Sequence, residues 1–100
     1  MTNEQLSKRI AELYGIASYF IYEEHHREWL HDDSARCFGL MVEHGVSLSV
    51  DVGIHESFGV STFLMGKVQL LSFERFADHN NDKALATRIT ILKCLLKMKE

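Results

Sequence analysis

The sequence predicts an α+β domain in which an antiparallel sheet of three or four strands is sandwiched by helices, with an additional short helix at the N-terminus. Apolar residues recur with a helical period near both ends of the chain and once before its middle, whereas the middle alternates apolar and polar residues. No proline interrupts any of these segments. A chain of 100 residues has room for one core, so we expect a single domain over 1–100.

The first helix is expected over residues 3–14. Thr2 and Gln5 have the spacing of a capping box, in which each side chain bonds to the backbone of the other residue. The apolar stripe of this helix consists of Leu6, Ile10 and Leu13. Gly15 then ends it, because a residue without Cβ adopts the left-handed conformation most easily. The apolar and β-branched residues 16–22 predict a short strand.

A second helix is expected over residues 33–44, because Asp33 is one of three consecutive good N-cap residues and Gly45 ends the apolar pattern. Its core-facing stripe is expected to consist of Ala35, Phe38, Met41 and Val42, which recur at spacings of three and four. Arg36 and Glu43 fall outside this stripe.

Alternation of apolar and polar residues predicts three strands over 46–52, 58–64 and 68–76. The loops between them are too short for parallel crossovers, so the strands should form an antiparallel meander. Gly66-Lys67 suits a two-residue hairpin turn. Leu70-Leu71 breaks the strict alternation and marks a possible bulge.

The last helix is expected over residues 82–99, with a stripe for the sheet made of Leu85, Ile89, Leu92 and Leu96. This helix and the one over 33–44 each need a surface to cover, and one sheet offers two faces. A neighbouring stripe is left over, made of Ile91, Leu95 and Met98. A small domain cannot bury all of its apolar surface in one core, so we expect a homodimer through this stripe. The alternative is that the first helix covers the stripe.

Composition and charge exclude several classes of function. The net charge of −3, without a basic stripe, argues against general nucleic-acid binding. No apolar run approaches the roughly 20 residues of a membrane-spanning helix. Residues 1–5 are polar, so we expect no secretory leader. Cys37 and Cys94 lie in apolar helical patterns and are expected to be reduced core thiols of a cytoplasmic protein, with one disulfide as the alternative.

The residues that could carry chemistry form no catalytic signature. Residues 23–33 are dense in Glu and His, but their spacing matches no zinc or di-iron pattern, which favours a solvated loop or a binding rim over a metal site. His55-Glu56-Ser57 has the form used by two-histidine phosphoesterases, but a second such motif is missing. We therefore expect a protein without catalytic residues, metal or cofactor. A small enzyme acting on a nucleotide or phosphoester, with histidines of 23–33 or His55, is the alternative.

We place the binding surface on residues 22–36. The candidate residues are two aromatic side chains, two arginines and two histidines, namely Tyr22, His25, His26, Arg27, Trp29 and Arg36. Backbone amides at a helix N-terminus attract anions, but Asp32 and Asp33 stand at the same place and would repel a phosphate. This conflict favours a protein partner over a nucleotide. The histidines of the segment, including His31, would make binding depend on pH.

The order of the expected elements and the Ala- and Leu-rich segment 82–93 resemble a family of small bacteriophage proteins, the phage ABA-sandwich domain. The resemblance covers roughly residues 35–96, together with a first helix that ends in Leu13-Tyr14-Gly15. Family members often carry Trp or Tyr in the middle strand, where this chain has Phe58 and Phe63. The family places an antiparallel sheet between helices, which agrees with the expected fold.

The resemblance also implies a function. Some small phage proteins of similar size and layout are counter-defence factors, which either sequester a nucleotide immune signal or cover a host defence protein. By analogy, we expect a non-catalytic inhibitor in the cytoplasm of the host bacterium, with a defence protein as the favoured partner and a nucleotide signal as the other. A virion or packaging accessory protein is a third possibility.

Overall fold

The computed structural model describes residues 1–16, 29–51, 59–64 and 70–100. Its elements are α1 (Asn3–Leu13), the short 3₁₀ helix η2 (Leu30–Asp32), α2 (Ser34–Glu43), β1 (Val46–Asp51), β2 (Gly59–Leu64), β3 (Leu70–Arg75), the 3₁₀ helix η3 (Phe76–His79) and α3 (Lys83–Lys99). The turn expected at Gly66-Lys67, and all but the first residue of the strand expected over 16–22, lie outside the described residues. Within the described ranges, no helix has the length and apolar character needed to cross a membrane.

The α+β class and the antiparallel meander are confirmed, with the three strands in the order β1-β2-β3. The expected bulge is present in β3. Thr62 pairs with Ser72, whereas the next residue, Phe63, pairs with Leu70, so that Leu71 is the additional residue. An additional residue in one strand locally disturbs the ladder and turns its side chain. Leu71 packs against the main core as a result.

The helix ends follow the sequence signals. The backbone N–H of Thr2 donates to the Gln5 side chain (2.8 Å) and the N–H of Gln5 donates to Thr2 Oγ1 (3.1 Å), which completes the capping box. Asp82 caps α3 by accepting a hydrogen bond from the N–H of Leu85. Gly15 follows α1 with a φ of +74°, a conformation that disfavours residues with a Cβ.

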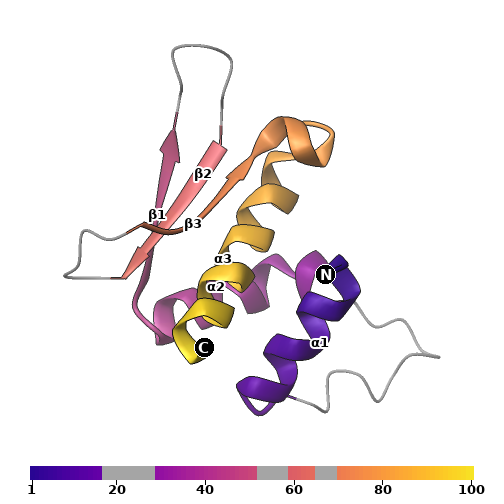
Figure 1. Cartoon of the computed structure of the whole chain (residues 1–100), viewed down its shortest axis with the longest axis vertical. Coiled ribbons are helices and arrows are strands. Elements are labelled where there is room, and N and C mark those ends of the chain that lie inside the picture. The colour runs from indigo at the N-terminus through magenta and orange to yellow at the C-terminus, as the bar shows by residue number, and fades with distance from the viewer. Residues whose placement is uncertain (17–28, 52–58, 65–69) are drawn as a thin grey trace.

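The helices assemble around α3, which lies between the sheet and α1 (Figure 1). α2 packs against α3 and reaches the sheet at β1. The main core joins residues from α1, η2, α2, β1 and α3, namely Leu6, Ile10, Leu30, Cys37, Leu40, Val46, Ile89, Ile91, Leu92, Cys94 and Leu95. α2 and α3 therefore contribute to one core, with α3 against β2 and β3 and α2 against β1.

The prediction of the core-facing side of α2 is wrong for three of its four residues. Ala35, Phe38 and Val42 are exposed, whereas Met41 is half-buried against the core. The buried residues of the helix are Cys37 and Leu40. α2 carries two apolar stripes, and its contact with η2 decides which of them is buried. The Cys37 thiol donates to the carbonyl oxygen of Leu30 (3.1 Å), which turns the Cys37 side of the helix inward.

The stripe expected to be left over on α3 is used inside the monomer. Ile91 and Leu95 are both fully buried in the same core as Leu6 and Ile10 of α1. In addition, the hydroxyl of Tyr14 donates to the carbonyl oxygen of Leu95 (2.7 Å). The first helix thus covers the face through which we expected a dimer, so a dimer needs a different surface.

Candidate functional site

Two of the six predicted binding residues lie in the described part of the chain. Trp29 directly precedes η2 and is half-buried, with its ring stacked near that of His31 at a centroid distance of 6.2 Å. Arg36 is exposed on the first turn of α2. The other four predicted residues lie outside the described ranges, namely Tyr22, His25, His26 and Arg27.

His31 is a buried connector and not part of a binding rim. Its side chain is 6% exposed, and its backbone N–H donates to Ser7 Oγ (2.9 Å). Since Ser7 Oγ accepts there, its hydroxyl proton is available for Nδ1 of His31 at 2.7 Å. In that arrangement, the ring proton lies on Nε2, which faces Glu4 (3.4 Å) and Asp32 (3.6 Å). The guanidinium of Arg88 donates to the His31 carbonyl oxygen (2.6 Å), which ties α3 to the same point.

The start of α2 is occupied by its own capping residue. Asp33 Oδ1 accepts the backbone N–H of Arg36 at 3.0 Å. On the other side of this turn, the Arg88 guanidinium donates to Ser34 Oγ (2.9 Å). The expected conflict between Asp33 and an anionic ligand is therefore present in the structure, because the carboxylate already uses a backbone amide that would bind a phosphate.

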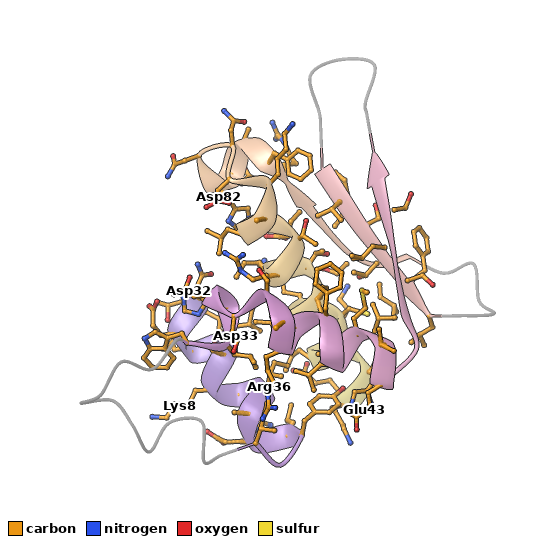
Figure 2. All side chains as sticks on the ribbon, turned by 180° about the vertical axis from the view of Figure 1, so that it is seen from behind. Lys8, Asp32, Asp33, Arg36, Glu43 and Asp82 are labelled. Atoms are coloured by element: carbon orange, nitrogen blue, oxygen red, sulfur yellow. The ribbon has the colours of Figure 1, made fainter. Side chains whose placement is uncertain are left out.

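The exposed side of α2 carries an apolar stripe, which we call the α2 outer face and define as Ala35, Phe38, Gly39 and Val42. All four residues are exposed, and their spacing places them on one side of the helix. Phe38 is 48% and Val42 75% exposed. A Cβ added at Gly39 would meet no atom of the described residues within 4 Å, so these residues leave the middle of the stripe open. Figure 2 shows α2 in front of the rest of the chain, with Arg36 near its start and Glu43 at its end.

A cleft of about 500 Å³ lies beside the α2 outer face, against the end of α1. Its lining residues are Leu13, Tyr14, Ile16, Ala35, Arg36, Gly39, Leu40, Glu43, His44 and Lys99. The rings of Tyr14 and His44 meet edge to face at 4.7 Å, and the Lys99 ammonium lies 5.0 Å from the centre of the Tyr14 ring. Burial raises the pKa of Tyr14, with a further contribution from Cys94, so its hydroxyl stays a hydrogen-bond donor at neutral pH.

Glu74 forms a second polar group, which sequence reasoning missed. Its Oε1 lies 2.9 Å from Nε2 of His79, and the Lys93 ammonium lies 3.1 Å from each of its two oxygens. The side chains of Glu74 and His79 are 14% and 13% exposed. The sequence carries no local signal for this group, because Ser72, two residues earlier on the same strand, is also polar and the partner Lys93 is 19 positions away.

The Glu74 cluster joins β3 and η3 to α3. It lines a second cavity of about 500 Å³ together with Ser72. A catalytic histidine would need a nucleophile such as a serine hydroxyl as its partner. The hydroxyl of Ser72, two residues before Glu74, is instead paired with Thr90 Oγ1 (2.9 Å), and His79 is bonded to the Glu74 carboxylate. The Lys93 side chain is 46% exposed, so the contact between Glu74 and Lys93 is a partly exposed ion pair, and this geometry gives it a structural role.

The remaining chemistry-bearing groups are thiols. Both cysteines are free and buried, as expected from their place in apolar patterns. Burial raises the pKa of the Cys37 thiol to about 12. A thiol with such a pKa is neutral at physiological pH and is a poor nucleophile. In the described ranges, no group of three or more His, Cys, Asp or Glu side chains is arranged to hold a metal ion.

Comparison with known proteins gives no relative. No family model, no curated protein and no solved structure matches the chain.

Proposed function

We propose that the protein is a non-catalytic binding protein whose α2 outer face docks onto another protein. The observation that supports this proposal is the second apolar stripe of α2, which the monomer leaves exposed although the first stripe is enough to anchor the helix. Contiguous apolar surface with polar residues at its edge is typical of protein–protein contact sites. Phe38 is the aromatic anchor of this surface, and Arg36 and Glu43 lie together at its opposite edge, on the side of Gly39 that lines the cleft.

A protein fits the α2 outer face better than a nucleotide. The face contributes one positive and one negative side chain, Arg36 and Glu43, and so offers no excess of positive charge for a phosphate. The N–H of Arg36 at the helix start is paired with Asp33. Aromatic and aliphatic side chains with a few charges around them suit the surface of a folded protein.

The resemblance to small phage proteins suggests the class of protein to which the partner belongs. We propose a host bacterial defence protein as the partner and inhibition by covering it as the mechanism, in the cytoplasm of the host bacterium. A nucleotide sponge, a phosphoester-processing enzyme and a virion accessory protein remain the competing proposals.

The test uses bacteria that carry individual defence systems and express wild-type protein or the Phe38→Asp variant. We expect the wild type to restore phage growth on one of these hosts and to co-purify with a protein of that system. Phe38→Asp should lose both effects, because the introduced charge would have to be buried in the contact. Ala84→Asp is the matched control, because it introduces the same charge at an exposed position of α3.

Three outcomes would refute the proposal. Phe38→Asp could act as strongly as the wild type, which would place the contact elsewhere. Heat-denatured protein could release an intact nucleotide acquired from the host, which would indicate a sponge. A nucleotide converted to product on incubation with the pure protein would indicate an enzyme. Circular dichroism of each variant excludes loss of fold as the cause.

A further inference from the structure

We infer that the α2 outer face also binds a second copy of this chain, with its α2 antiparallel to the first about a twofold axis near Gly39, so that self-association competes with the proposed partner for one surface. This inference rests on the proposed function in one respect, namely that the α2 outer face is a protein-binding surface. This dimer forms through α2 and not through the stripe of α3 that the sequence predicts, because α1 buries that stripe.

The shape of the face permits a close approach of two helices. Ala35 and Gly39 are the small residues of the stripe and lie one helical turn apart. Two backbones can approach closely where small residues face each other, and the space around Gly39 is open. Phe38 and Val42 stand beside this point and are largely exposed in the monomer. In the pair, each copy would cover them with the side chains of the other.

The charges of the face are complementary to themselves in the antiparallel orientation. Helical rise places Arg36 about 4.5 Å before Gly39 along the axis and Glu43 about 6 Å after it. If two helices cross at Gly39 in opposite directions, Arg36 of one copy lies within about 1.5 Å, along the axis, of Glu43 of the other. The twofold axis repeats this ion pair. In a parallel pair, the twofold axis would run along the helices and would place the Arg36–Glu43 edges of the two copies on opposite sides of the contact. Neither ion pair could then form, so the charges favour the antiparallel dimer.

The size of the face sets the strength of the dimer. α2 has 10 residues and is about 15 Å long. Such a contact is smaller than the roughly 800 Å² per partner of a standard stable interface. We therefore expect a reversible dimer with a dissociation constant on the order of 10–100 µM. Sedimentation velocity from 5 µM to 1 mM should show the mass rising from 11.5 kDa toward twice that value.

The decisive experiment exchanges the two charges. Arg36→Glu alone and Glu43→Arg alone each place like charges opposite each other twice per dimer, and each should raise the dissociation constant at least tenfold. The double variant with both substitutions should return to within about threefold of the wild type. An acid in the first turn and a base in the last turn both complement the helix dipole. Circular dichroism and the free energy of unfolding of each single variant show whether α2 stays folded.

Two further measurements complete the test. Phe38→Asp should abolish the dimer, whereas Ala84→Asp on α3 should leave it unchanged. A wild type that stays at 11.5 kDa up to 1 mM would overturn the inference, as would a double charge variant that fails to recover. The same measurements test the proposed function independently of the dimer. If the wild type is monomeric and Phe38→Asp still loses its host partner, the function stands and the dimer does not. If the charge exchange restores the dimer and Phe38→Asp keeps its host partner, the dimer stands and the proposed docking face for the host protein does not.

Discussion

The side chain of Ser7 on α1 makes two hydrogen bonds with one residue, His31 of η2. Ser7 Oγ lies 2.9 Å from the backbone nitrogen of His31 and 2.7 Å from its ring nitrogen Nδ1. Both residues are buried, and the two are 24 positions apart in the sequence. One hydroxyl therefore satisfies two buried polar groups. It also holds η2, which precedes α2 in the chain, against α1.

Ser7→Ala should destabilise the protein by about 2 kcal/mol, because it leaves the backbone N–H and Nδ1 of His31 buried without a partner. The measurement is urea unfolding followed by circular dichroism. Ser49→Ala is the control, since Ser49 is exposed on β1 and should change the free energy of unfolding by less than about 0.5 kcal/mol. Equal effects of the two substitutions would contradict a bridging role for Ser7.

Ile89→Asp should cost several kcal/mol, because Ile89 is 1% exposed in α3 and the substitution would bury an unpaired charge. At a typical small-domain stability, this variant is largely unfolded at 25 °C. Ala84→Asp makes the same change at an exposed position of the same helix and should unfold like the wild type. Thermal unfolding distinguishes the two, and an unchanged melting temperature of Ile89→Asp would refute the packing of α3.

Gly59 and Gly39 should respond to alanine with opposite signs. A Cβ at Gly59 would lie 2.5 Å from Cζ of Phe73 and 2.6 Å from the carbonyl oxygen of Glu74. The ring can turn aside, but the backbone oxygen belongs to the adjacent strand, so Gly59→Ala should cost about 1–3 kcal/mol. A Cβ at Gly39 meets nothing within 4 Å, and Gly39→Ala within α2 should add about 0.5–1 kcal/mol. Urea midpoints at low protein concentration test both, and a stabilising Gly59→Ala would show that the close approach is absent.

Local signals in the sequence were sufficient for the three α-helices and the three strands of the described residues, but not for the short helices η2 and η3. The capping box of Thr2 and Gln5, the cap at Asp82 and Gly15 after α1 fix helix ends through contacts within a few residues. Alternation of side chains similarly fixed the strands, and the irregular pair Leu70-Leu71 marked the bulge. Such features depend on the residues nearby, so a sequence can reveal them without knowledge of the tertiary contacts.

The orientation of α2 could not be predicted in this way. Its two apolar stripes are similar in character, and the burial of Cys37 depends on a contact with Leu30, which a helical period does not contain. The Glu74 cluster could not be predicted for the same reason, since Lys93, the partner of Glu74, is 19 positions away on another element. The sequence pattern places His31 among the histidines of the binding segment, whereas its burial depends on the distant Ser7. In each case the missing information is a long-range contact.

The stability of the protein should fall as pH rises above about 9. Burial raises the pKa of the Cys37 thiol from its ordinary 9.0 to about 12, while Arg88 lowers it to a smaller extent. Burial also raises the pKa values of Cys94 and Tyr14. Below the ordinary pKa, the folded and the unfolded chain both hold these protons, and folding is independent of them. Between about 9 and about 12, the unfolded chain releases the Cys37 proton first, so deprotonation favours unfolding.

The measurement is the free energy of unfolding in urea at pH 7, 9 and 10, for wild type and Cys37→Ala. The variant loses packing at every pH, but its stability should fall less steeply between pH 9 and 10, because one group with a raised pKa is gone. Thiol labelling gives an independent check at pH 8. Neither buried thiol should react in the folded protein, whereas both should react in urea. Rapid labelling of the folded wild type that is absent from Cys37→Ala would show that Cys37 is accessible to solvent and that α2 does not hold it against η2. Identical pH slopes for the two proteins would show that burial does not raise the pKa of Cys37.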